Sequence, residues 1–252
     1  MATKPVVLIL GAGPRIGASL ASHFSKSNYS IALASRHGTN TLLPNGHLSL
    51  LADFSHPSSI PSLFASVQTH FSTPPSVVIY NAGAFTPPPS TTNVLSIPAE
   101  GLAGDFNVNT ISPYVAAQEA VKAWDGMGDG EGGKGKGVFI STGNKCNVEI
   151  VPWPMMLTGG AGKAATAYWI GTVDGLMKEK GYRFFYADER FPDGKLKGAA
   201  LDGDAHGEFY VHLAEQGGTG VDGREGVPWH ATFVKGKGYV YFKKDAEEAG
   251  AA

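Results

Sequence analysis

The chain has 252 residues, of which 42% are hydrophobic, and its 20 basic and 22 acidic residues give a formal net charge of −2. This length suits a single α/β domain with a sizeable core, and the balanced charge gives no reason to expect nucleic acid or an anionic membrane surface as a partner. The single cysteine, Cys146, excludes an internal disulfide, and no His/Cys cluster has the spacing of a zinc site, so no metal is expected.

The ends and the loops of the chain give further limits. No stretch approaches the roughly 20 apolar residues that a membrane-spanning helix needs, and no secretory pattern precedes the first strand-like run. We therefore expect a cytoplasmic protein that forms one domain over residues 1–252. Within it, the glycine-rich segment 126–137 predicts a flexible loop, and the small, charged residues 243–252 predict a frayed tail.

A glycine-rich turn lies near the start of the chain. Residues 5–10 form a short apolar run, which is typical of a parallel strand buried on both faces. They lead into Gly11-Ala-Gly-Pro-Arg-Ile-Gly17, and residues 18–26 have helical composition. Glycines at such a junction let backbone N–H groups approach a pyrophosphate, and the following helix adds partial positive charge. The segment predicts a dinucleotide-binding turn, with an ordinary tight turn as the alternative.

Two arginines bear on which dinucleotide would bind. Residues 30–35 are predicted to form the second strand, and Arg36 follows it directly. An Arg here suits the 2′-phosphate of NADP, whereas an acid would suit the ribose hydroxyl of NAD. Arg15 stands inside the glycine turn, where positive φ would be uncomfortable, so either the turn is altered or Arg15 reaches the cofactor phosphates. The two residues favour NADP(H); a solvated surface arginine is the alternative for Arg36.

Strand and helix signals alternate along the rest of the chain. Further buried strands are predicted at residues 48–52, 77–80, 138–142 and 181–187, and the last strand signals fall at 229–234 and 239–242. Helices are predicted at residues 57–71, 102–124, 158–178 and, as a lid, 201–216. Five or six strands that alternate with helices predict a doubly wound parallel sheet with helices on both faces and a ligand at the carboxyl ends of its strands.

Polar residues stand where these strands end. Asp53 follows the third strand, Asn81-Ala82-Gly83 follows the fourth, and Thr142 ends the fifth. Lys163 lies on the next helix. A hydroxyl at a strand end beside a helix-borne lysine is a plausible catalytic pair, and we expect both groups at the edge where the glycine turn lies.

These motifs, in this order, resemble the short-chain dehydrogenase/reductase family over about residues 5–240. The resemblance implies a Rossmann-like domain whose NADP(H) contacts are Gly11, Gly13, Arg15, Ile16, Gly17, Arg36, Asp53, Asn81, Ala82, Gly83 and Lys163. It implies catalytic roles for Thr142 in place of the family's Ser, for Lys163, and for Asn109, which would kink its helix and hold a water. The family commonly pairs through its long helices, so a homodimer or tetramer is expected.

The pattern departs from the family at the centre of its chemistry. The family has a Tyr four residues before its Lys, and here that position is Gly159. The phenol is the family's proton donor or acceptor, a task that glycine cannot perform. Tyr80 replaces the first Asn of the family's Asn-Asn-Ala-Gly, and Asp188-Glu-Arg stands where a Pro-Gly would follow the sixth strand.

No single residue replaces the missing tyrosine in the pattern. Tyr168 is rotated by roughly 140° from Lys163 on a helix and is expected to pack into the core or an interface. Each of the other candidates is of a type more often found as a surface residue than as a catalyst, and they are Asn144, Lys145, Asp188, Glu189, His206 and Tyr210.

Two functions from different classes follow. The first is an NADPH-dependent reductase of a small, secondary-metabolic substrate (an imine or iminium, an activated alkene or a carbonyl) that needs no Tyr donor. The second is a non-redox cyclase, isomerase or dehydratase, whose substrate would meet an apolar rim of Trp153, Met155, Met156, Trp169 and Phe191. A non-catalytic nucleotide-binding regulator is a third. The glycine turn, Arg36 and Lys163 favour the first, because a non-redox protein has no evident need for a 2′-phosphate contact.

Overall fold

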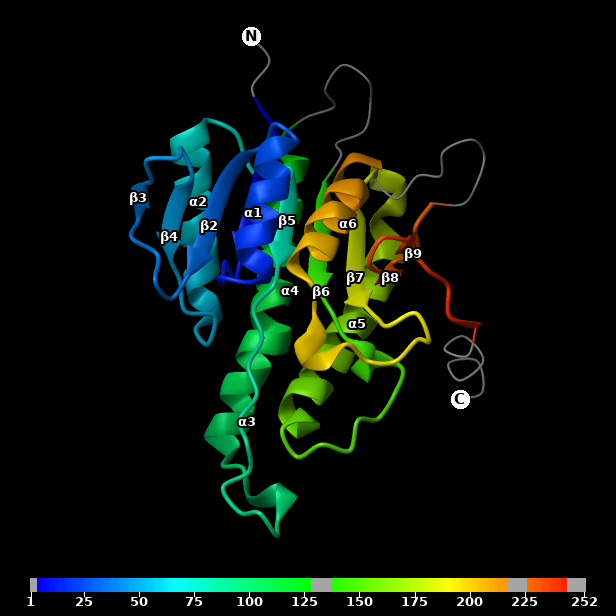
Figure 1. Cartoon of the computed structure of the whole chain (residues 1–252). Helices are drawn as coiled ribbons and strands as arrows, with labels where there is room; N and C mark the ends of the chain where they lie inside the picture. Colours follow the sequence, from blue (N-terminus) through cyan, green and yellow to red (C-terminus); the bar gives the residue numbers. More distant parts are fainter. Residues whose placement is uncertain (1–3, 128–136, 217–225, 244–252) are drawn as a thin grey trace.

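The computed structural model describes residues 4–127, 137–216 and 226–243. The predicted flexible loop and frayed tail fall almost entirely outside these ranges. The strands are β1 (Val6–Leu10), β2 (Ser30–Ser35), β3 (Thr41–Leu42), β4 (Leu48–Leu51), β5 (Val77–Tyr80), β6 (Val138–Thr142), β7 (Arg183–Glu189), β8 (His230–Val234) and β9 (Gly238–Tyr239). They form one sheet in the order β3-β4-β2-β1-β5-β6-β7-β8-β9 (Figure 1).

The seven strands from β4 to β8 in this order pair in parallel, while β3 and β9 pair antiparallel at the two edges. The predicted doubly wound sheet is therefore confirmed, although five or six strands was too few. β3 was missed because its two residues are exposed and carry no apolar run. The central strands are apolar throughout, since helices cover both of their faces.

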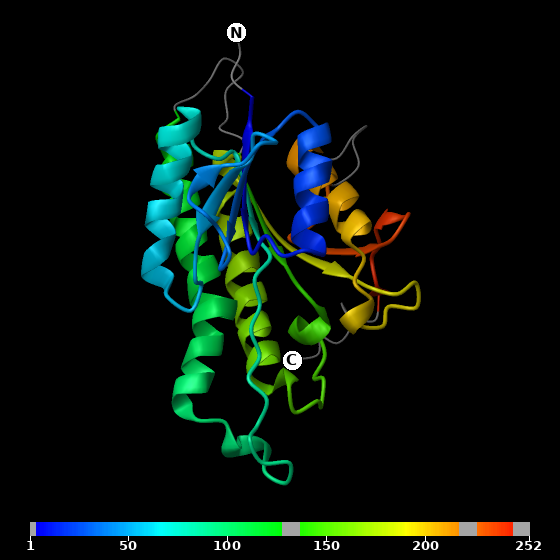
Figure 2. The ribbon, with the colours of Figure 1, turned by 60° about the vertical axis from the view of Figure 1, so that its left-hand side comes forward.

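The helices are α1 (Ile16–Lys26), α2 (Ile60–Phe71), α3 (Ala99–Phe106), α4 (Ser112–Asp125), α5 (Met156–Met177) and α6 (Gly203–Gln216). Two cores lie on opposite faces of the sheet: α2, α4 and α5 pack on one face, and α1 and α6 on the other (Figure 2). Alternating strand residues supply the two cores. Leu8 faces the first and Ile9 the second, as the period of a strand requires.

The predicted long helix over 102–124 is interrupted. α3 ends at Phe106, a π-helical segment η3 (Asn107–Ile111) follows, and α4 then begins with Pro113 in its first turn. A π segment inserts an extra residue into the helical hydrogen-bond ladder and so bends the helix axis. Asn109, where the resemblance implied a kink, lies in this π segment and is buried.

The helix α6 is not a lid. It packs beside α1 on the face of the sheet, with Phe209, Tyr210 and Leu213 buried (Figure 2). A Cβ at Gly207 would lie 2.3 Å from the His23 ring, so this glycine permits the close approach of the two helices. The apolar stripe that was assigned to a lid therefore faces the core.

Two features are absent from the described ranges. No helix there is both long and apolar enough to cross a membrane. Among the same residues no three or more His, Cys, Asp or Glu side chains gather in a way that could hold a metal ion.

Candidate functional site

The glycine turn after β1 requires glycine at two of its positions. Gly11 has a φ of +99°, and a Cβ there would lie 2.5 Å from the Ala82 backbone nitrogen. A Cβ at Gly17 would lie 2.7 Å from the Ala12 carbonyl carbon. At Gly13, by contrast, an added Cβ would meet nothing within 4 Å. The turn thus packs tightly against the end of β5 and leaves open space at Gly13, in front of the N-terminus of α1, where an anion is favoured.

Arg15 does not take the positive φ that would be uncomfortable for it in this turn. Its φ is −93°, so the positive φ that would trouble an Arg falls on Gly11 instead. One guanidinium nitrogen, Nη2, donates to the carbonyl oxygens of Ala199 and Leu201 at 3.1 and 3.2 Å. Arg15 therefore ties the turn to the segment after β7. Contact with a cofactor phosphate would require it to leave these carbonyls, and stays a prediction.

Arg36 and Asp53 lie near the ends of the neighbouring parallel strands β2 and β4, and both are exposed. The backbone N–H and Oγ of Ser55 donate to Asp53 at 3.0 and 2.8 Å, and these bonds, with His56 and Arg36 nearby, lower the pKa of the carboxyl. The Arg36 guanidinium is thus free in solvent at the place where a 2′-phosphate is expected.

Asn81 connects three strand ends. Its Nδ2 donates to the Gly11 oxygen at 2.9 Å, and its Oδ1 accepts from Thr142 Oγ1 at 2.9 Å. Its backbone nitrogen donates to the Leu10 oxygen at 2.7 Å. The ends of β1, β5 and β6 are thereby fixed to one another, and Ala82 and Gly83 follow directly on the same edge.

Thr142 is held inside the sheet edge. Its hydroxyl donates to Asn81 and accepts from Tyr210 Oη at 3.0 Å, on the α6 side. Burial raises the pKa of Tyr210, so the phenol remains a donor in this bond. Tyr210 therefore positions the Thr142 hydroxyl, although the sequence predicted it on a lid. One lone pair of the Thr142 hydroxyl is left for a substrate.

Lys163 meets Thr142 through the backbone. Its Nζ donates to the Thr142 carbonyl oxygen at 2.7 Å and lies 3.5 Å from the Ala82 oxygen. Burial lowers the pKa of Lys163 from 10.5 to about 8. An ammonium has three donors, so one proton remains for a ligand. The predicted pair of Thr142 and Lys163 is adjacent, but the contact does not use the Thr142 hydroxyl.

The place of the family's tyrosine is covered by an aromatic ring. A Cβ at position 159 would lie 2.8 Å from Cδ1 of Phe85 and 3.3 Å from the Ala84 oxygen. Real Cβ atoms do not approach a ring this closely, so a side chain here would displace Phe85. Pattern reading missed Phe85, which lies in the proline-rich connection after β5. Its position beyond Asn81-Ala82-Gly83 was the only signal in the sequence.

Asn109 fixes the π segment to the same connection. Its Nδ2 donates to the Ala84 oxygen at 2.5 Å, and its Oδ1 accepts from the Ala84 nitrogen at 3.2 Å. Thr166 on α5 donates to the Asn109 carbonyl oxygen at 2.6 Å, and a Cβ at Gly162 would lie 2.7 Å from Asn109 Cβ. The side chain thus positions the segment that carries Phe85. The water expected of it stays a prediction.

The other candidate proton donors lie elsewhere. β7 extends to Glu189, so Asp188 and Glu189 belong to the strand and are buried. Asp188 accepts from Arg190 at 2.7 Å, and Glu189 accepts from the Asp202 nitrogen at 2.7 Å. His206 is buried, which lowers its pKa. These groups tie the segment after β7 to the sheet.

Three further residues are corrected or explained by their surroundings. Tyr168 is 80% exposed, so it does not pack into the core, and its packing in an interface stays a prediction. Asn144 caps the short helix η4 (Lys145–Asn147) by accepting from the Cys146 nitrogen at 3.0 Å. Lys145 pairs with Glu149 at 2.5 Å.

An apolar cavity adjoins the first turns of α5. It has a volume of about 470 Å³ and is lined by Cys146, by Trp153 in the connection before α5, and by Met156, Leu157 and Gly160 on α5. Trp153 and Met156 belong to the predicted apolar rim. Gly160 directly follows Gly159 on the helix.

The sheet order, the open glycine turn and the position of Asn81 and Lys163 at the carboxyl ends of the strands define a Rossmann-type dinucleotide-binding fold. No family model matches the chain. A short chain dehydrogenase/reductase from Cryptosporiopsis sp. (strain 8999) is 36% identical to it over 259 residues, which cover 97% of this chain and 98% of that protein. The chain therefore belongs to the short-chain dehydrogenase/reductase family of oxidoreductases.

Solved structures agree with this fold. A 3-ketoacyl-(acyl-carrier-protein) reductase from Brucella melitensis, complexed with NADH, superposes with a TM-score of 0.72 at 15% identity, over 93% of this chain and 99% of that one. The NADPH-dependent 3-quinuclidinone reductase from Rhodotorula rubra has a TM-score of 0.71 at 18% identity, over 94% and 92%. At these identities the likeness establishes the fold alone, and the two nucleotides differ.

Proposed function

We propose that this protein is a cytoplasmic, NADPH-dependent oxidoreductase of atypical type, which reduces a small secondary-metabolic substrate without a tyrosine proton donor. One observation carries the proposal: the nucleotide side of the site keeps its geometry, while Phe85 covers Gly159 on the proton-donating side. The open space at Gly13 and the free Arg36 fit a dinucleotide with a 2′-phosphate.

Each residue of the nucleotide side has a defined task in this proposal. Backbone N–H groups of the glycine turn and of the α1 N-terminus bind the pyrophosphate. Arg36 binds the 2′-phosphate, and the remaining proton of Lys163 Nζ binds a ribose hydroxyl. Bound NADPH supplies the hydride.

The proton side sets the class of substrate. Phe85 offers an aromatic face and no proton, and the hydroxyl of Thr142 is engaged with Asn81 and Tyr210. A substrate whose reduced carbon or nitrogen takes a proton from water, such as an iminium or an activated alkene, fits this arrangement better than a ketone. The apolar cavity of about 470 Å³ would hold its hydrocarbon part.

A non-redox cyclase, isomerase or dehydratase is the second candidate. The same ring over Gly159 favours it, because loss of the family's proton donor is also the change expected when reduction is abandoned. The two candidates differ in what happens to the nicotinamide.

The deciding experiment uses NADPH that carries deuterium at the hydride-donating carbon. The protein is incubated with cyclic imines, activated alkenes and ketones, and the products are examined by mass spectrometry. We expect deuterium in an imine or alkene product and its loss in Lys163→Met. NADPH that binds and is never consumed, together with conversion of a substrate at constant mass, would establish the non-redox candidate instead.

We further propose a homodimer that pairs through α4 and α5. Large apolar side chains on these helices are exposed, among them Ile111 just before α4, Tyr114 on α4 and Leu176 on α5. Leu176 is 75% exposed, which is unfavourable for a side chain of its size in water. A second copy of the chain would cover it.

A further inference from the structure

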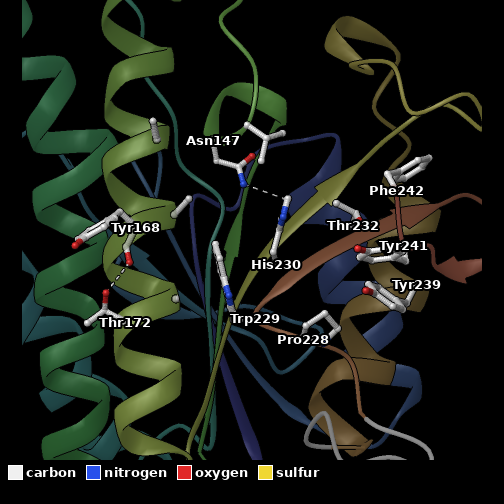
Figure 3. A pocket seen from close by; sticks show the side chains of 14 residues that line it. Asn147, Tyr168, Thr172, Pro228, Trp229, His230, Thr232, Tyr239, Tyr241 and Phe242 are labelled. Carbon is white, nitrogen blue, oxygen red and sulfur yellow. Dashed lines mark hydrogen bonds between the residues drawn. The ribbon is translucent and has the colours of Figure 1, made fainter. Parts of the chain in front are cut away.

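A second cavity lies on the flank of α5 that faces β8 and β9. It has a volume of about 680 Å³. Figure 3 shows Tyr168 on one side, Tyr239, Tyr241 and Phe242 on the other, and Trp229 and His230 between them. None of the fourteen described residues that line it is Asp, Glu, Lys or Arg. We call it the aromatic cleft.

Trp229 and His230 lie between the two sides of the cleft, with their rings packed against each other. The rings of Trp229 and His230 are stacked, with centroids 5.4 Å apart and planes inclined by 29°. A Cβ at Gly171 on α5 would lie 2.9 Å from the Trp229 ring, so this glycine lets the indole lie directly against the helix. Aromatic faces favour a planar aromatic ligand, and the absence of charge among the described lining residues disfavours an ionic one.

His230 supplies a directed polar group. Asn147 Nδ2 lies 3.1 Å from His230 Nε2 and, in this orientation of the amide, donates to it (Figure 3). His230 Nε2 also lies 3.9 Å from Asp188 Oδ2. In the neutral tautomer that accepts from Asn147 at Nε2, the imidazole carries its proton on Nδ1, and Nδ1 is then a donor. No described residue forms a hydrogen bond with Nδ1. A ligand with a carbonyl oxygen would match this group.

The cleft is separate from the nucleotide side. The short helix η4 divides them: Cys146 is buried and packs toward Gly160, whereas Asn147 lines the cleft. The glycine turn and Asn81 lie at the ends of the central strands β1 and β5, and the cleft lies against β8, next to the edge strand β9. A ligand in the cleft therefore need not displace a nucleotide.

We propose that the aromatic cleft is a second ligand site, which binds an uncharged, planar aromatic compound bearing a carbonyl group. The flat face stacks on Trp229, and the carbonyl oxygen accepts from His230 Nδ1. The site does not depend on the proposed reductase activity.

The test compares two ligands of the same shape, 9-fluorenone and fluorene, of which only fluorenone has a carbonyl. Quenching of tryptophan fluorescence measures both affinities on the full chain. We expect both to bind, with fluorenone tighter by about 2- to 10-fold, the range of one neutral hydrogen bond. His230→Phe keeps an aromatic ring and should reduce fluorenone to the affinity of fluorene. The matched control, His70→Phe on α2, should change neither.

Three results would overturn the proposal. The first is that neither compound binds. If, in addition, Tyr241→Ala dissociates an oligomer of the protein, the cleft is an interface with a second copy of the chain. The second is a preference for fluorenone that survives His230→Phe. The third is loss of fluorenone binding at saturating NADPH, which would place the probe in the nucleotide site. Failure of NADPH itself to bind would leave the cleft result intact and count only against the reductase.

Discussion

At the scale of single residues, Gly159, where the resemblance to the family places a tyrosine, lies against an aromatic ring. Phe85 fills the space beside the glycine and is itself held in place by the bonds between Ala84 and Asn109. A side chain at position 159 would therefore have to displace this ring. We expect that a tyrosine placed here by itself would not adopt the family's geometry.

We predict that Gly159→Tyr gives no robust ketone reduction and lowers the free energy of unfolding by about 1–3 kcal/mol, the usual cost of overpacking. The reason is the 2.8 Å approach of a Cβ to the Phe85 ring. Urea denaturation and an NADPH-oxidation assay measure the two effects. The double variant Gly159→Tyr/Phe85→Ala should regain stability. Strong ketone reduction by the single variant would show that only the tyrosine was missing.

Lys163 should make stability depend on pH. Its pKa falls from 10.5 in the unfolded chain to about 8 in the folded protein, so the unfolded state holds more protons between these values and wild-type stability rises with pH there. Relative to Lys163→Met, which cannot titrate, we expect the wild type to gain about 2–3 kcal/mol between pH about 7 and about 10. Urea denaturation across this range measures the gain. Parallel curves for the two proteins would contradict it.

The motif residues could be placed from the sequence because each follows a strand at a fixed point of a known order. Asn81 follows β5 as predicted, and the Nζ of Lys163, on α5, reaches the carboxyl end of β6. Phe85 and Tyr210 could not be placed, since the path of an irregular connection and the face of a helix depend on packing between distant segments.

At the scale of elements, α5 is joined to β7 by a buried ion pair. Arg183 Nε donates to Asp174 Oδ1 at 2.9 Å, and the Phe184 backbone nitrogen donates to the same oxygen at 2.9 Å. Both side chains of the pair are only 9% exposed. The carboxylate therefore neutralises a buried cation and also accepts a hydrogen bond from a backbone N–H near the start of β7.

We predict that Asp174→Ala lowers the free energy of unfolding by about 3–5 kcal/mol, because it leaves the Arg183 charge buried without this carboxylate. The control is Lys122→Ala in an exposed pair with Glu119, which should change stability by less than about 1 kcal/mol. Both values come from urea denaturation. A loss at Asp174 no larger than at Lys122 would contradict the assignment.

The predicted ends of strands and helices were wrong where tertiary contacts override the local sequence pattern. Acidic residues are normally rare in strands, but β7 continues through Asp188 and Glu189. Arg190 pairs with Asp188 at 2.7 Å, and Lys197 pairs with Glu189 at 3.1 Å, so both buried carboxylates have a cationic partner. The long helix is divided because five residues around Asn109 adopt a π segment, which no hydrophobic period announces.

At the scale of the whole molecule, alternation of strands and helices was sufficient to predict the doubly wound sheet. Short apolar runs separated by amphipathic segments allow few other arrangements. The role of α6 was not predictable in this way, since a lid and a core helix carry the same apolar stripe.

The proposed dimer makes its own prediction. Tyr114→Glu and Leu176→Glu place charges on the outer faces of α4 and α5 and should shift sedimentation velocity from dimer to monomer. Ile150→Glu changes a side chain that is 88% exposed outside these helices and should leave the assembly unchanged. A wild-type monomer at all concentrations would refute the pairing.

The most direct test of the central claim is a calorimetric titration of the purified protein with NADPH and, separately, with NADH. We expect NADPH to bind more tightly, and Arg36→Ala to weaken NADPH by about 10- to 100-fold, the range of a hydrogen bond to a charged group, while NADH is unaffected. His37→Ala, at the neighbouring exposed position, is the control. If neither nucleotide binds at about millimolar concentration, the binding free energy is weaker than about −4 kcal/mol. That result would contradict the account.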